Sequence, residues 1–484
     1  MVSTPHANHT CACRPPCQRP QVRNRRRRPS EGGACRFPPP EDIARHNRHQ
    51  EDCASLGGNI GGPIRKNKTF FFATYEYTKS KSPSSQTATF PTLEQRNGDF
   101  SKTLFSNGQL ITIFNPFDTF KDATGAVKRT PFPGNIIPKS MMDPVALKGA
   151  QYYPLPNQDP NPVTHINNWF QQDIGESHNL PVFDFKGDHI FTDKLRFTGR
   201  YSVNFSASSP ANLFGASSAA LGAADPYNGP SQTKTQTSTG NITYAQNATT
   251  IWTATYGFVY SNYNRDPFVN NIDLTTFGLP KSMQDLATYH MFPMFSAGGY
   301  SDIGTQGYWK MDRQEGVHQF SGSITKVKGA HNIKAGAEFR RNFLDYAQPG
   351  YPAGHFTFGA QTTSQDLFTG SSTQGNGFAS MLLGFGNGSD FHIDPKAFSR
   401  AGYWGSFIQD DWKITKDLTM NIGVRYSNES PFNTKYGLMS QFDPNGTDKL
   451  TGGKGAIVHQ NSALARRDNN NFNPRLGLAW HPLQ

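Results

Sequence analysis

Residues 195–205 read LRFTGRYSVNF, a stretch in which the character of the side chain alternates at every position. One set of positions is apolar or glycine: Leu195, Phe197, Gly199, Tyr201, Val203 and Phe205. The set between them is polar: Arg196, Thr198, Arg200, Ser202 and Asn204. Because successive side chains of a strand point to opposite faces, this alternation predicts a β-strand with one apolar and one polar face.

The same pattern recurs along the chain, in pairs of stretches that are separated by short turns. FDFKGDHIF (183–191) is joined to the first strand by TDK, which predicts a tight hairpin. Further hairpins are predicted at 241–263, 318–341 and 404–427, with turns at QNAT, KGAH and ITKD, and a last strand at 472–480. Two of these strands have equally clear apolar faces: Trp252, Ala254, Tyr256, Phe258 and Tyr260, and Leu418, Met420, Ile422, Val424 and Tyr426.

The composition indicates an all-β protein rather than a disordered one. Only 35% of the 484 residues are hydrophobic and the mean hydropathy is −0.62, yet 13% are aromatic. Disordered chains are depleted in aromatic residues. The longest apolar run, FASMLLGF at 378–385, is far shorter than the roughly 18–20 residues that a membrane-spanning helix needs, so only strands could cross a membrane.

The connections between the predicted hairpins are long and polar, at 206–240, 264–316, 342–402 and 428–471. Short turns at one end of the strands and long loops at the other are typical of outer-membrane barrels. A soluble sandwich would instead need a second apolar layer, which connections rich in Gly, Ser, Asn and Pro do not supply. The sequence therefore predicts a transmembrane antiparallel β-barrel.

The first 56 residues differ from the rest, because they contain ten Arg and no Lys. The run RNRRRRP (23–29) would suit nucleic acid or an anionic membrane, but no recognition motif accompanies it and we expect no nucleic-acid partner. All the cysteines lie here, in spacings that do not fit a zinc site: Cys11, Cys13, Cys17, Cys35 and Cys53. We expect residues 1–54 to be a disordered, non-native segment from a misjoined reading frame, followed by a barrel domain at 55–484.

Three short stretches raise the question of chemistry, and each has a simpler interpretation. GFGNGSD (384–390) lacks the Lys-Ser/Thr of a phosphate-binding loop and opens no helix, so we expect a flexible loop. Asp410 and Asp411 are adjacent in a strand and would point to opposite faces, which excludes a shared carboxylate site. DPNGTD (443–448) contains oxygen ligands for Ca²⁺ but is also an ordinary loop sequence. We therefore predict no catalytic, cofactor-binding or metal-binding residues, and no enzymatic activity.

Several segments together resemble one family. In chain order they are SLGGNIGGPIRKNKTFFFATYEY (55–77), FPTLEQRNGDFS (90–101), PFPGNIIP with DPVA (131–146), YYPLPN (152–157), FTDKLRFTGRYS (191–202), SFIQDDWKITKDLTMNIGVRY (406–426) and NNNFNPRLGLAW (469–480). This combination is similar to the Oar-like branch of TonB-dependent outer-membrane receptors, from about residue 55 to the C-terminus.

The resemblance implies a location in the Gram-negative outer membrane and a barrel of about 22 strands that is closed by a plug. It also implies uptake of an extracellular ligand of unknown class, with energy supplied through TonB, ExbB and ExbD. About ten strands are evident here, so we expect a fragment: a partial barrel with long extracellular loops, without the plug and the later strands. The substrate-binding residues are unknown, and the only other expected partner is outer-membrane lipid.

The segment at 55–80 can be interpreted in this light. Its glycines would allow close backbone packing where an entering segment meets the barrel wall, RKNK (65–68) would form a turn, and TFFFATYEY (69–77) would be a barrel strand. The run Phe70–Phe72 would lie at the interfacial belt. The residues expected to face lipid are Phe71, Ala73, Tyr75 and Tyr77, and those expected to face the lumen are Thr74, Glu76 and Thr78.

Two other functions remain open at this point. A passive outer-membrane barrel, such as a porin or an adhesin, would show the same strand pattern without energy coupling. A secreted β-rich carbohydrate-binding protein or enzyme would be soluble and would not be found in the membrane fraction.

Overall fold

The computed structural model describes residues 52–210, 212–214, 225, 229–366, 374–460 and 467–481. The expectations for the first 51 residues, including Cys11, Cys13, Cys17 and Cys35, lie outside the described residues. The predicted boundary at residue 54 falls within the first described strand, which begins at Asp52. Within the described part of the chain, the secondary structure is dominated by strands, as the alternation predicts.

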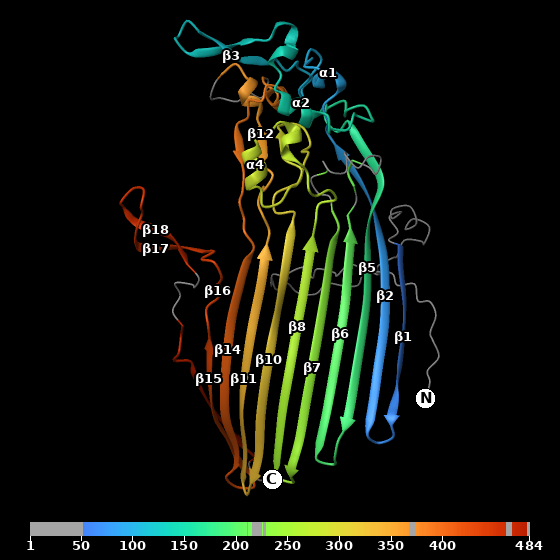
Figure 1. Cartoon of the computed structure of the whole chain (residues 1–484), viewed down its shortest axis with the longest axis vertical. Coiled ribbons are helices and arrows are strands. Elements are labelled where there is room, and N and C mark those ends of the chain that lie inside the picture. The colour runs from blue at the N-terminus through green and yellow to red at the C-terminus, as the bar shows by residue number, and fades with distance from the viewer. Residues whose placement is uncertain are drawn as a thin grey trace, which may run out of the picture.

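One large antiparallel sheet forms the body of the molecule, and its strands follow one another as a meander (Figure 1). In order across the sheet they are β1 (Asp52–Arg65), β2 (Thr69–Ala88), β5 (Trp169–Ile190), β6 (Leu195–Ser209), β7 (Ser231–Asn247), β8 (Thr250–Arg265), β10 (Met311–Lys328), β11 (His331–Ala347), β14 (Ala397–Lys413), β15 (Leu418–Glu429) and β19 (Phe472–Trp480). The two-residue β16 (Asn433–Thr434) adds to β14, and β17 (Met439–Thr447) pairs with β18 (Lys454–Gln460) as a separate hairpin.

The turns at one end of the sheet are short, and each lies where the sequence places it. TDK joins β5 to β6, QNAT (246–249) covers the end of β7 and the turn before β8, and ITKD joins β14 to β15. Two further turns contain a residue with positive φ, Asn67 at 58° and Gly329 at 57°. Such a conformation suits Gly and Asn best, which explains the choice of RKNK and KGAH at these corners.

The strand register gathers the apolar side chains on one face of the sheet. Tyr256, Phe320, Phe339 and Trp404 are paired directly across β8, β10, β11 and β14. The adjacent row on the other face, in the same strands, is Thr255, Ser321, Glu338 and Gly405. Directly paired residues share a face, so the register aligns the alternation of each strand with that of its neighbours. We call the two sides the apolar face and the polar face.

The glycine-rich half of 55–80 is itself a strand, which corrects the expectation of an entering segment that only packs against the wall. β1 pairs with β2 along almost its whole length. A Cβ at Gly61 would lie 2.8 Å from the Phe72 ring, and a Cβ at Gly57 would lie 2.8 Å from the carbonyl oxygen of Tyr75. These two positions therefore require glycine because β2 lies too close for a side chain.

The faces of β2 follow the prediction, with one exception. Phe71, Ala73 and Tyr75 pair with residues of β5 that share the apolar face, as expected. The Phe70–Phe72 run is divided between the faces, because Phe70 pairs with Asp188 and Phe72 with Lys186 on the polar face. Strand geometry makes this unavoidable, since three successive side chains always alternate.

Two of the predicted polar connections, 264–316 and 342–402, are not loops, because they fold together with residues 89–168 into a cap at the ends of the strands opposite the short turns (Figure 1). Strands β2 and β5 extend toward it over 20 and 22 residues, well beyond the roughly ten residues that cross a membrane. Its helical elements are α1 (Leu93–Arg96), η2 (Pro133–Asn135), η3 (Lys139–Met141), α2 (Pro144–Ala150), η4 (Leu274–Phe277), α4 (Lys281–Leu286), η5 (Ala360–Thr363) and α5 (Gly377–Leu382). Its strands are β3 (Phe114–Lys121), β4 (Val127–Pro131), β9 (Met294–Ala297), β12 (His355–Phe358) and β13 (Gly388–Asp390).

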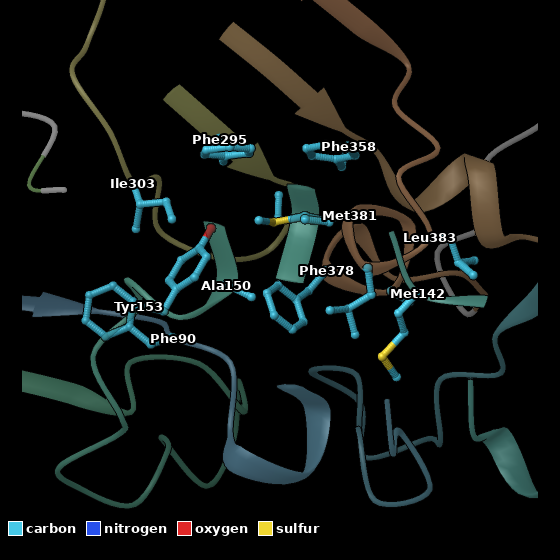
Figure 2. Close-up of a cluster of buried hydrophobic side chains, with 14 of the residues drawn as sticks. Phe90, Met142, Ala150, Tyr153, Phe295, Ile303, Phe358, Phe378, Met381 and Leu383 are labelled. Carbon is cyan, nitrogen blue, oxygen red and sulfur yellow. The ribbon is translucent and has the colours of Figure 1, made fainter. Parts of the chain in front are cut away.

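The cap has an aromatic core of its own, which the sequence did not indicate (Figure 2). Phe90, Tyr153 and Phe378 meet edge to face, with ring centroids 5.7–6.0 Å apart along this series. Phe90 and Tyr153 come from the connection between β2 and β5, whereas Phe378 follows Tyr153 by 225 residues, in the connection between β11 and β14, so no local pattern shows that they pack together. The run FASMLLGF provides the centre of this core as α5, whose six residues are all buried.

Removal of one ring from this core is expected to destabilise the cap alone. Phe378 is fully buried, so Phe378→Ala leaves a cavity and lowers the free energy of unfolding of the cap by about 3–5 kcal/mol. A urea titration with protease cleavage between residues 89 and 168 as its readout measures this change. Phe120→Ala, at a ring that is 46% exposed on the β3–β4 hairpin, serves as the control and should leave the midpoint unchanged. Equal midpoints for the two variants would show that the aromatic cluster does not hold the cap together.

Candidate functional site

The polar face of the sheet is divided into three zones, and the first, on β5 and β6, carries charges that compensate one another. Arg200 pairs with Asp184 at 2.7 Å, and Lys186 pairs with Asp188 at 3.2 Å. The hydroxyl of Thr198 also donates to Asp188 at 2.7 Å. Arg200 and Lys186 therefore each have a carboxylate beside them.

The second zone, on β7, β8 and β10, carries hydroxyl and amide groups. Thr253 and Ser323 share a hydrogen bond of 2.8 Å, and the amide of Asn241 donates to Thr255 at the same distance. Its members are Thr235, Thr237, Thr239, Asn241, Thr253, Thr255, Ser321 and Ser323. Such a surface can donate and accept hydrogen bonds to many neutral polar solutes without an ionic preference.

The third zone, on β11, β14 and β15, centres on one carboxylate that serves two cations. Glu338 lies 2.8 Å from the Nε of Arg340 and 3.6 Å from the Nη2 of Arg425. Arg425 also donates to the hydroxyl of Tyr403 at 2.7 Å, and the guanidinium of Arg340 stacks 4.0 Å from the centre of that tyrosine ring. This zone therefore carries more positive than negative charge, held in a defined geometry.

In the cap, buried polar groups tie distant connections together. Arg129 on β4 is buried, and its Nη1 donates to the carbonyl oxygens of Gln361 and Ser364 at 2.9 and 3.0 Å. Burial lowers the pKa of this guanidinium. Burial also raises the pKa of the Tyr153 hydroxyl, which lies in the aromatic core without a hydrogen-bond partner among the described residues. Arg129 therefore ties β4 to the connection that contains Gln361 and Ser364.

Ser296, His355 and Asp390 bring together the residue types of a hydrolase triad, on β9, β12 and β13. The Ser296 hydroxyl oxygen lies 3.0 Å from His355 Nε2, and His355 Nδ1 lies 3.4 Å from the Asp390 carboxylate without a hydrogen bond. Burial raises the pKa of the nearby Asp302 carboxyl, and an interaction with Ser296 partly offsets that rise. In a catalytic triad the carboxylate holds the histidine by a hydrogen bond, and His355 Nδ1 has no such bond among the described residues. Ser296, His355 and Asp390 link β9, β12 and β13, and we call them the clasp.

The stretches that the sequence analysis considered lie apart from one another. GFGNGSD is not wholly a loop, because it runs from the end of α5 into the short strand β13. Asp410 and Asp411 point to opposite faces as predicted: Asp410 pairs with His331 at 2.6 Å, and Asp411 accepts a hydrogen bond from Asn421. DPNGTD lies at the end of β17, and Cys53 lies in β1.

Among the described residues, no group of three or more His, Cys, Asp or Glu side chains is arranged to hold a metal ion. No helix in the described part of the chain is long and apolar enough to cross a membrane. The candidate functional surfaces are the polar face, with its three zones, and the cap. The sequence contained the polar-face residues in its alternating stretches, but only the strand register shows which of them are neighbours.

Residues 43–484 match the sequence model of a family described as "Outer membrane beta barrel domain". No protein with a curated description matches the chain. Among solved structures, the chain is similar to the outer membrane transporter YddB from Escherichia coli, at 9% identity and a TM-score of 0.39 over 79% of this chain and 35% of that one. It is also similar to the ferripyoverdine receptor of Pseudomonas aeruginosa, at 9% identity and a TM-score of 0.38 over 89% of this chain and 38% of that one.

A third similar structure is the ferric-catecholate import receptor Fiu from Escherichia coli, at 10% identity and a TM-score of 0.36 over 90% of this chain and 48% of the receptor. The chain therefore spans less than half the length of each of these three proteins.

The stability of the cap is expected to depend on pH through Asp302, and one substitution at this residue should remove that dependence. Burial raises the pKa of Asp302, so the folded cap holds this proton more tightly than the unfolded chain does, and stability falls as the pH rises through the raised pKa. Asp302→Asn imitates the protonated form and can still accept from Ser296. We expect it to raise the melting temperature of the cap at pH 7.5 and to flatten its decline between pH 4 and pH 7.5, measured by scanning calorimetry.

Asp273→Asn is the matched control, because the sign of its effect is opposite. Hydrogen bonds from the side chain and the backbone of Thr275 lower the pKa of Asp273, so its carboxylate contributes stability that is lost as the pH falls through that pKa. This variant should lower the melting temperature at pH 7.5. If Asp302→Asn also lowered the melting temperature, burial of the ionised Asp302 carboxylate would not destabilise the cap.

Proposed function

The chain belongs to the outer membrane beta barrel domain family, and on this basis we propose that it forms the wall and the cap of a receptor that takes up a ligand by energy-coupled transport. Members of such a family cross the outer membrane of Gram-negative bacteria with strands, because a closed sheet satisfies its backbone groups without water. The observation that carries the proposal is a two-faced sheet that continues into a folded cap at one end only.

The two faces of the sheet suit the two environments of a barrel wall. Phe197, Tyr256 and Trp404 on the apolar face are partly exposed, as lipid-facing side chains are. The opposite side carries the hydroxyl and charged zones, which suit a wet lumen. We therefore assign the apolar face to lipid and the polar face to the lumen.

The cap supports ligand capture, because it is a folded surface on the side of the long connections, which is extracellular in outer-membrane barrels. Its β3–β4 hairpin exposes Phe117 and Phe120, and rigidly supported loops are common binding surfaces. Energy coupling through TonB, ExbB and ExbD rests on the family resemblance of the sequence. The solved structures mentioned above include receptors for ferric siderophores, and we propose a ligand of the same general kind, a solute too large for a passive pore.

The assignment of the faces predicts that arginine is tolerated on one side of β7 only. Ser238 pairs with Tyr201 and Phe258 on the apolar face, while Thr237 pairs with Ser202 and Val259 on the other. Ser238→Arg should cost about 2–4 kcal/mol of folding free energy in lipid vesicles, because it places a charge in hydrocarbon. Thr237→Arg should cost far less. Both free energies are measured by urea titration of the folded protein inserted in the vesicles. If Thr237→Arg cost more than Ser238→Arg, the polar face rather than the apolar face would lie against lipid.

Energy coupling predicts that uptake depends on the inner-membrane proton gradient. Cells that make the protein should accumulate its ligand, and a protonophore should stop accumulation while leaving surface binding intact. Purified protein in liposomes should not conduct small sugars in a swelling assay. Free conduction of sugars, together with uptake that survives the protonophore, would identify a passive porin instead.

A further inference from the structure

Three cations lie together on the polar face, at the edge of the third zone that is nearest β19. Lys334, Gln409, Gly423 and Arg475 form one row across β11, β14, β15 and β19. The adjacent row places Phe407 beside Arg425. The side chains of Lys334, Arg425 and Arg475 therefore come from three different strands and face the same space.

This space is a hollow of about 490 Å³, which all three cations line. Phe407 forms its flat apolar side, because its ring lies over Gly336, where a Cβ would be 2.7 Å from the ring. A second hollow of about 180 Å³ adjoins it and shares Lys334, Phe407 and Arg425. There the hydroxyls of Thr253, Ser321 and Ser323 complete the lining, so hydrogen-bond donors and positive charge converge on one place.

Among the described residues, the positive charge of this hollow is not fully balanced by carboxylates. Its one acidic lining residue, Glu338, is already shared between Arg340 and Arg425. Among the described residues, neither Lys334 nor Arg475 has an ion-pair partner, in contrast to the compensated cations Arg200 and Lys186 on β6 and β5. Like charges that line one partly enclosed space repel one another and attract an anion.

We propose that this hollow binds a small organic anion carrying carboxylate or phosphate groups. Guanidinium and ammonium groups form their strongest hydrogen bonds with such oxyanions, and the hydroxyls and the Phe407 ring would contact the neutral part of the molecule. The inference rests on the proposed function in one respect, since a lumen must bring the solute to this face. The inference adds to that function that the substrate is anionic rather than neutral, and that this hollow selects it.

Citrate is a suitable probe, because its three carboxylates match the three cations. Isothermal titration calorimetry on the whole chain in detergent micelles should show binding that weakens as sodium chloride is raised. Lys334→Gln with Arg475→Gln should weaken citrate binding at least about tenfold, since each removes a charge-assisted contact. Lys334→Arg with Arg475→Lys should retain it. Circular dichroism on each variant establishes that the strand content is unchanged.

The matched control is Lys186→Gln with Arg200→Gln, which removes two cations from the same face where carboxylates already compensate them. Citrate affinity should then change less than about twofold. Absence of citrate binding to the unaltered chain, or equal losses in the two double variants, would overturn the proposal. If the protein binds citrate but its uptake does not depend on the proton gradient, the site proposed here stands. Only the proposed transport mechanism is then overturned.

Discussion

A backbone that crosses hydrocarbon has no water to bond with, so every N–H and C=O group must find its partner on a neighbouring strand. This constraint determines the register, and the register determines everything else on the two faces. Tyr256, Phe320, Phe339 and Trp404 come from four separate stretches and still form one apolar row, because their strands are paired without a slip. A shift by a single residue in one strand would move its aromatic rings into the lumen and its polar groups into lipid.

Where the strands leave the apolar layer, charge pairs replace the aromatic rows. Asp312 pairs with Lys396 at 2.7 Å and Asp345 pairs with Arg400 at 2.5 Å, at the ends of β10 and β11 that adjoin the cap. Beyond these pairs the chain is stabilised differently, because the cap lies in water and must bury apolar groups of its own. It does so with rings from connections that are far apart in sequence, around α5. The molecule therefore combines a wall stabilised by strand pairing with a cap stabilised by packing.

The sequence could predict the wall because its information is local. Alternation at 195–205 and 418–426 defines both faces of a strand, and short turns such as KGAH define which strands are neighbours. The cap could not be predicted in this way, since Phe90, Tyr153 and Phe378 meet only in three dimensions. The same holds for the cation-lined hollow. Arg425 stands at a polar position of its alternating stretch, but only pairing across four strands shows that Lys334 and Arg475 are its neighbours. β1 was missed because glycines hide the alternation of its two faces.

The central claim is that the apolar face meets lipid and the polar face meets water. It is tested most directly by spin labels placed one at a time at residues 197–203 of β6, in the protein reconstituted in lipid vesicles. Collision rates with oxygen, which concentrates in lipid, and with a water-soluble nickel complex should alternate with a period of two. Labels at 197, 199, 201 and 203 should favour oxygen, and those at 198, 200 and 202 should favour nickel. Uniform access to nickel along the whole segment would contradict a membrane wall.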